Sequence, residues 1–79
     1  MTVFVVLDEA SSELARAIDK FGPMTSPHEG ISVIREEFEE LWDHVKRDTG
    51  RTAEARAEAI QLAAMALRYA NDLCVDQTP

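Results

Sequence analysis

Residues 26–48, SPHEGISVIREEFEELWDHVKRD, decide the fold of this chain. The first residues predict the start of a helix. The side chain of Ser26 can cap free N–H groups, and Pro27 fits the first helical position. Glu29 completes a capping box with Ser26. Apolar residues then recur at spacings of three and four, the helical period. They form one stripe within about 100° of arc, namely Ile31, Ile34, Phe38, Leu41, Trp42 and Val45. The pattern predicts an amphipathic helix over residues 27–48 that buries this stripe.

Two further helices flank this segment, behind glycine-containing breaks at residues 21–27 and 47–52. In residues 3–20, apolar side chains again recur at helical spacing. The β-branched run 3–7 alone would suit a strand, but it has no partner strand, so we expect a helix. Residues 52–76 are rich in alanine, the best helix former. We therefore predict an all-α fold of three helices in a single domain that spans residues 1–79.

The third helix is apolar on two nearly opposite sides. One side carries Ile60, Ala63, Ala64, Leu67, Ala70 and Cys74, and the other carries Leu62, Met65, Ala66 and Tyr69. Both sides must be covered, and the two other helices of so short a chain can hardly do so. We therefore predict that this helix packs against its own copy in a homodimer or homotetramer, which completes a helical bundle.

The composition limits the partners and the compartment. The chain has 15 acidic and 8 basic residues and a net charge of −7, which argues against nucleic acid as a partner and is compatible with divalent cations. The apolar opening MTVFVVL is too short for a membrane span and wrongly flanked for a signal peptide. Cys74 is the only cysteine, which suits a reducing compartment. We expect a soluble, cytoplasmic protein with no membrane partner.

Glutamates crowd the middle of the second helix, in EEFEE at residues 36–40. Glu37 and Glu40 are three residues apart, so their side chains meet over one helical turn at the edge of the predicted buried stripe. On the third helix, Glu58 stands within an apolar face, where a carboxylate is costly unless it is paired or bound to a metal. Two antiparallel helices could aim these three carboxylates at one point and hold Mg²⁺ or Mn²⁺.

A solvated acidic helix face is the alternative to a metal site. Glutamate is a strong helix former and is common on exposed helices. Arg35 or Arg47 could neutralise part of the charge from one helical turn away. Composition alone leaves both interpretations open.

The chain resembles the MazG-like, all-α nucleoside triphosphate pyrophosphatases, and in particular their short, single-domain, phage-type members. HEGISVIREEFEELWDHVK and RAEAIQLAAMALRYANDL carry the resemblance, which covers roughly residues 27–73. The family has EExxE on one helix and ExxD on the next; here the second motif reads Glu58-Ala59-Ile60-Gln61. The resemblance implies that Glu37, Glu40 and Glu58 bind Mg²⁺, with Gln61 in the fourth ligand position.

The resemblance also implies an activity, the hydrolysis of a (deoxy)nucleoside triphosphate to the monophosphate and pyrophosphate. Glu36 and Glu37 would be catalytic, with Glu36 a second ligand or the group that orients water. Cations must bridge carboxylates and phosphates, because an acidic pocket repels a bare triphosphate. Arg68 and Lys20 are candidate phosphate contacts, and Trp42 could stack on the base or belong to the core. The nucleotide preference stays open.

Gln61 keeps a different class of function open. An amide can ligate a metal through its oxygen, but it brings no charge and cannot act as a base at neutral pH. The alternatives are therefore a nucleotide binder with a degenerate metal site and a non-catalytic helical oligomerisation or interaction module.

Overall fold

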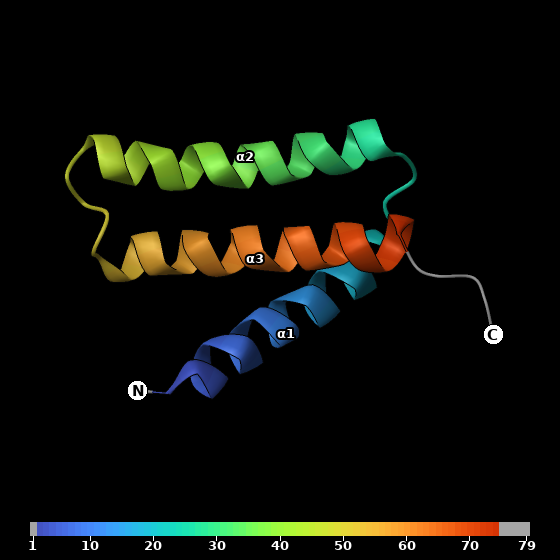
Figure 1. The fold of residues 1–79 in the computed structure, drawn as a ribbon, viewed down its shortest axis with the longest axis horizontal. Coiled ribbons are helices and arrows are strands. Elements are labelled where there is room, and N and C mark those ends of the chain that lie inside the picture. The colour runs from blue at the N-terminus through green and yellow to red at the C-terminus, as the bar shows by residue number, and fades with distance from the viewer. Residues whose placement is uncertain (1, 75–79) are drawn as a thin grey trace.

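The computed structural model describes residues 2–74 of the chain. Three α-helices follow one another: α1 (Val3–Phe21), α2 (Pro27–Lys46) and α3 (Ala53–Leu73) (Figure 1). No strand occurs within residues 2–74, which confirms the all-α prediction for this part. The predicted helices, 3–20, 27–48 and 52–76, differ from these only at their ends, and residues 75 and 76 lie outside the described part. None of the helices in residues 2–74 has the length and apolar content needed to cross a membrane.

Side-chain caps begin α2 and α3, and the cap on α2 is the one that the sequence predicts. The hydroxyl of Ser26 accepts a hydrogen bond from the N–H of Glu29 at 3.1 Å, and Thr52 accepts one from Ala55 at 3.2 Å. The carboxylate of Glu29 in turn accepts from the N–H and the hydroxyl of Thr25. These bonds satisfy N–H groups that have no partner inside the helix. Local sequence therefore determines where the two helices begin.

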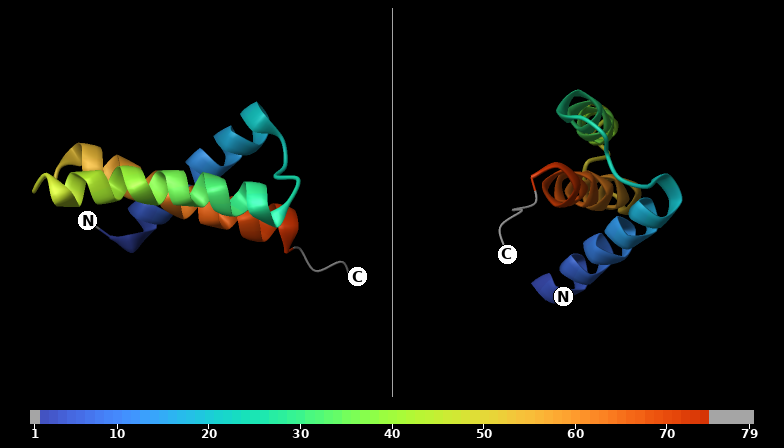
Figure 2. Two further views of the ribbon diagram at one scale, coloured as in Figure 1. Left: turned by 90° about the horizontal axis from the view of Figure 1, so that it is seen from above. Right: turned by 90° about the vertical axis from the view of Figure 1, so that its right-hand side faces the viewer.

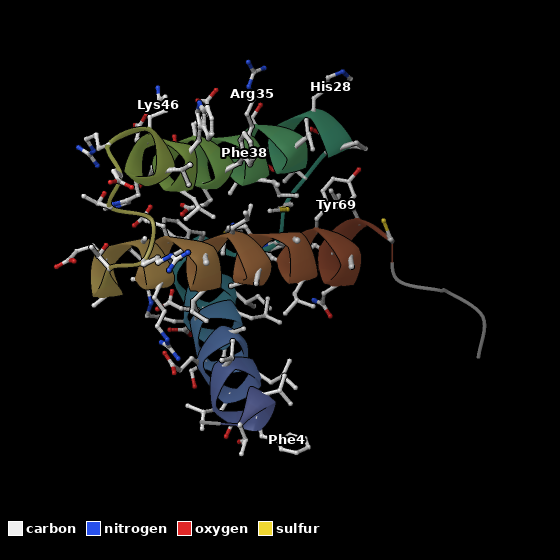
Figure 3. The ribbon with its side chains drawn as sticks, turned by 60° about the vertical axis from the view of Figure 1, so that its left-hand side comes forward. Phe4, His28, Arg35, Phe38, Lys46 and Tyr69 are labelled. Carbon is white, nitrogen blue, oxygen red and sulfur yellow. The ribbon has the colours of Figure 1, made fainter. Side chains whose placement is uncertain are left out.

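α3 lies between the other two helices. α2 runs antiparallel along one side of α3, and α1 crosses another side at an angle (Figures 1 and 2). α1 packs on α3 through small side chains, with Ala17 and Ala64 both fully buried. On the other side Tyr69 points from α3 toward α2 (Figure 3) and lies against Gly30. Residues without bulk at these two contacts allow the helices to approach closely.

The two apolar sides predicted for α3 are covered only in part within one chain. Ile60, Ala64 and Met65 are buried, whereas Leu67 is 45% exposed. α1 packs over Ala64, and α2 packs over Tyr69. The two helices approach α3 from different directions and leave a third direction of α3 uncovered (Figure 2). From residue 59 to the end of α3, the exposed apolar side chains form a narrow stripe of small residues beside one larger side chain, namely Ala59, Ala63, Ala66, Leu67 and Ala70.

The prediction that α2 buries its apolar stripe was wrong for most of the stripe. Four of its side chains are about half exposed: Ile31 at 55%, Phe38 at 54%, Trp42 at 48% and Val45 at 50%. The side of α2 that is turned toward α3 carries Gly30, Val33, Ile34, Glu37, Leu41 and His44. A single neighbouring helix covers only part of a helix circumference, and here it covers the edge that includes Glu37.

Candidate functional site

A pocket of about 600 Å³ opens among the three helices. Ala17 and Phe21 of α1, Val33 of α2 and Met65 of α3 form apolar parts of its wall. Its charged side chains are Glu29, Glu36, Glu37, Glu40, Glu58, Arg16 and Arg68. The pocket thus combines a concentrated group of carboxylates with two guanidinium groups, and it includes all four glutamates to which the sequence assigns a role.

Three of these carboxylates converge on α2. Glu36, Glu37 and Glu40 each place one oxygen within 4.8 Å of the others. Their spacing along the chain explains this, because Glu40 follows Glu37 by three residues and Glu36 by four, and such residues are neighbours on a helix surface. Glu37 is half-buried, whereas Glu36 and Glu40 are exposed. Oxygen atoms gathered at such distances suit a hard divalent cation, although exposed acidic groups also gather without one.

Glu58 brings a fourth carboxylate from α3. It is half-buried, and its Oε2 is shielded from solvent without a hydrogen-bond partner in residues 2–74. Carboxylates only accept hydrogen bonds, so the neighbouring Glu40 cannot satisfy this oxygen unless one of the two carries a proton. An unsatisfied carboxylate oxygen is costly to bury. This side of the pocket therefore calls for a proton or a cation.

The raised pKa values of Glu40 and Glu37 also indicate that this pocket favours a bound proton or cation. A hydrogen bond to Glu58, which forms only when one of the two carboxyl groups is protonated, raises the pKa of Glu40 to about 7. Burial and the charges of Glu37, Glu58 and Glu36 add to the effect. Burial is the main reason for the raised pKa of Glu37, followed by repulsion from Glu58. Near neutral pH the pocket therefore holds a proton that a bound cation could replace.

Arg68 supplies buried positive charge in the same pocket. Its side chain is 8% exposed, and its Nη2 donates to the carbonyl oxygen of Gly22 at 2.9 Å. Its Nε has no hydrogen-bond partner in residues 2–74, since the closest carboxylate oxygen, Oδ2 of Asp72, is 3.6 Å away. The guanidinium also lies 5.7 Å from the ring centre of Phe21. The pair with Asp72 is an ion pair, and Nη1 donates to Sδ of Met65 at 3.8 Å. A guanidinium in the pocket wall suits an anionic ligand.

Gln61 contacts both the acidic pocket and helix α1. It contributes to the wall of the acidic pocket, but its Nε2 donates to Oε2 of Glu13 on α1 at 2.7 Å. The structure thus places the fourth predicted ligand position beside the glutamates and ties its amide to a carboxylate of another helix.

Two predicted nucleotide contacts lie elsewhere. Neither Lys20 nor Trp42 is part of the pocket wall. Lys20 lies over the ring of Phe21 at 5.1 Å, so it is close to the edge of the pocket. Trp42 is half exposed on α2. The residues brought together are therefore the glutamates, Gln61 and Arg68.

Glu13 and Arg16 were missed in the sequence. Arg16 lines the pocket and pairs with Glu13 at 2.7 Å. The sequence contained one indication that Glu13 lies near a helix contact. Glu13 adjoins Leu14 and lies one helical turn before Ala17, on the predicted apolar side of the first helix. Which helix that side would meet was not visible in the sequence.

The donor set fits Mg²⁺ or Mn²⁺. Carboxylate oxygens come from two facing helices, the pocket is open to water, and a shielded oxygen of Glu58 lacks a donor. Both ions take oxygen ligands and keep several waters. In comparisons with protein-family models, with curated proteins and with solved structures, no match to this chain was found.

Proposed function

We propose that this protein is a Mg²⁺-dependent nucleoside triphosphate pyrophosphohydrolase that converts a (d)NTP to a (d)NMP and pyrophosphate. The observation that carries the proposal is the shielded, unpartnered Oε2 of Glu58, which shares a pocket with the converging carboxylates of Glu36, Glu37 and Glu40. The resemblance to MazG-like enzymes supports the same assignment, since Glu36, Glu37, Glu40 and Glu58 are the residues that match the motifs of that family.

The residues of the pocket divide into two roles. Glu37, Glu40 and Glu58 would hold the metal, and Mg²⁺ would neutralise phosphate charge and make the α-phosphate a better electrophile. An exposed carboxylate oxygen of Glu36 would orient the attacking water and accept its proton. Arg68, in the wall of the same pocket, would attract a phosphate oxygen through its guanidinium charge. The pocket volume of about 600 Å³ is in the range of small-molecule sites.

A nucleotide binder without catalysis is the second candidate. Gln61 favours it, because the amide replaces a carboxylate and already donates a hydrogen bond to Glu13. A site with less charge holds a divalent cation more weakly. Such a protein would still bind a metal–triphosphate complex through the glutamates and Arg68.

A second copy of the chain would cover the exposed apolar surface. At 100° per residue, the exposed stripe of α2 and the exposed alanines of α3 lie on the same side of the α2–α3 pair, away from the carboxylates. Ile31, Phe38, Trp42 and Val45 are each about half exposed, and a contiguous group of exposed apolar side chains is typical of an interface. We propose a homodimer or homotetramer formed through this surface, to be checked by sedimentation at several concentrations. A folded monomer at all concentrations would contradict it.

The function is tested by pyrophosphate release from a panel of dNTPs with and without millimolar Mg²⁺. Glu58→Gln should abolish both the release and the Mg²⁺-dependent rise in melting temperature. Glu39→Gln is the matched control, since Glu39 lies exposed on α2 and pairs with Arg35 at 3.2 Å. A rise in melting temperature without release would favour the binder. If Mg²⁺ has no effect on either quantity, the acidic cluster is a solvated surface.

A further inference from the structure

The orientation of the Gln61 amide follows from the structure without ambiguity. Oε2 of Glu13 lies 2.7 Å from Nε2 of Gln61, and it also accepts from Nη2 of Arg16 at 2.7 Å. A carboxylate paired with an arginine can only accept hydrogen bonds, so the amide atom beside it must be the NH₂ group.

Gln61 forms part of the wall between two pockets. One is the acidic pocket, and the other, of about 490 Å³, lies between α1 and the start of α3 and includes Glu13. Because the NH₂ group is turned toward Glu13, the carbonyl oxygen is the amide atom left for the acidic pocket. An amide oxygen is a neutral ligand for a hard cation, whereas an NH₂ group at the same place would repel it.

Glu13 is itself held in place. Arg16, one turn further along α1, donates to both of its oxygens, from Nε at 3.0 Å and from Nη2 at 2.7 Å. The side chain of Glu13 is 24% exposed, so it is partly shielded between the helices. A fixed acceptor behind a ligand is how proteins orient the groups that contact a metal.

We propose that Glu13 is a positioning residue that turns the Gln61 carbonyl oxygen toward the metal. The inference rests on the proposed function, because it presupposes that the acidic pocket binds a divalent cation. It assigns to α1 a part in a site whose ligands come from α2 and α3. It also explains how the amide of Gln61 can act as a metal ligand. A carboxylate has two oxygens and can ligate in either orientation, whereas an amide must turn its single oxygen toward the metal.

A double-mutant cycle tests this role with Mn²⁺ as the probe. Calorimetry would measure Mn²⁺ binding to the unaltered protein, Glu13→Met, Gln61→Glu and the double variant. Loss of an orienting partner typically weakens metal binding about 10–100-fold, and we expect this for Glu13→Met when Gln61 is present. In the Gln61→Glu background the same change should not weaken binding, because a carboxylate offers an oxygen in either orientation.

Glu9→Met is the matched control. Glu9 lies one turn earlier on α1 and pairs with Arg56 at 2.6 Å, so the change removes the same charge without touching Gln61. Equal weakening by Glu13→Met in both backgrounds, or by Glu9→Met, would show a general charge effect and overturn the positioning role. No weakening by Glu13→Met would also overturn it. Melting curves verify folding, and Glu13→Ala, which also lacks an acceptor, replaces the methionine variant if that variant is unfolded.

The two proposals fail in different ways. If the unaltered protein does not bind Mn²⁺, the proposed function itself is refuted. If the unaltered protein binds Mn²⁺ and Glu58→Gln abolishes binding, but Glu13→Met has no effect, only the role of Glu13 is refuted.

Discussion

Without metal, the protein should lose stability as the pH rises from 5.5 to 8. The folded-state pKa of Glu40 is about 7, above the ordinary value of 4.5, so the folded protein holds a proton that the unfolded chain releases. Such a group stabilises the fold fully below about pH 4.5, and that contribution is lost as the pH rises through about 7. Glu37, whose pKa is also raised, acts in the same direction.

The expected size is about 1 kcal/mol. Each pKa unit between the folded and unfolded states corresponds to about 1.4 kcal/mol, but Glu40 is exposed and solvent screens much of its interaction. For a domain of this length, 1 kcal/mol shifts the melting temperature by about 4–8 °C. Glu9, Glu13 and Glu29 have lowered pKa values and lose their contribution as the pH falls below 4.5. Between pH 5.5 and 8, the change in stability therefore reports on the raised pKa values of Glu40 and Glu37 and not on the lowered ones.

Thermal melting in EDTA at several pH values measures this loss. Glu58→Gln should flatten the profile, because it removes a repelling charge and its amide can donate to an ionised Glu40. Saturating Mg²⁺ should flatten it as well, since a cation takes the place of the proton. Glu39→Gln should leave the slope unchanged. A flat profile for the unaltered protein, or a full slope in Glu58→Gln, would refute the reasoning.

Three further predictions concern the fold and the ligand. Gly30→Ala should lower the free energy of unfolding by about 1 kcal/mol, because the added Cβ would lie 2.5 Å from Cδ2 of Tyr69. This cost should exceed the gain from the better helix propensity of alanine. An unchanged urea midpoint would show that the Tyr69 ring moves aside without cost. Ser26→Ala removes the cap that accepts from Glu29 and should cost about 1 kcal/mol in the same assay. Arg68→Lys keeps the charge but loses the planar fork, so KM for the triphosphate should rise about 10-fold; an unchanged KM in the folded variant would exclude a phosphate contact.

Most of the secondary structure and part of the site could be predicted from the sequence. The starts of α2 and α3 depend on Ser26 and Thr52, whose hydroxyls bond groups three residues away. The convergence of Glu36, Glu37 and Glu40 depends on the spacing of residues along one helix. Both are local properties, so the pattern of residues is sufficient to predict them.

The exposure of the α2 stripe could not be predicted, because amphipathic patterns show which side chains are apolar and not which neighbour covers them. Phe38 and Trp42 lie on the apolar side of α2, yet α3 packs against the adjacent side, where Gly30 permits close contact with Tyr69. Small residues at Ala17 and Ala64 likewise let α1 cover a part of α3 that was expected to need another chain.

The sequence by itself determined three helices, their starts and the concentration of carboxylates on α2, because short-range backbone and side-chain contacts control these features. The sequence also predicted that Glu58 could face that cluster and that Arg68 could contact the ligand. Only the tertiary structure decided that an oxygen of Glu58 has no partner there, that Arg68 is buried in the same pocket, and that α1 reaches the site. The bond between Glu13 and Gln61 joins residues 48 positions apart. Its existence depends on the angle at which α1 crosses α3, which is set by the packing of both helices and by no single segment of the chain.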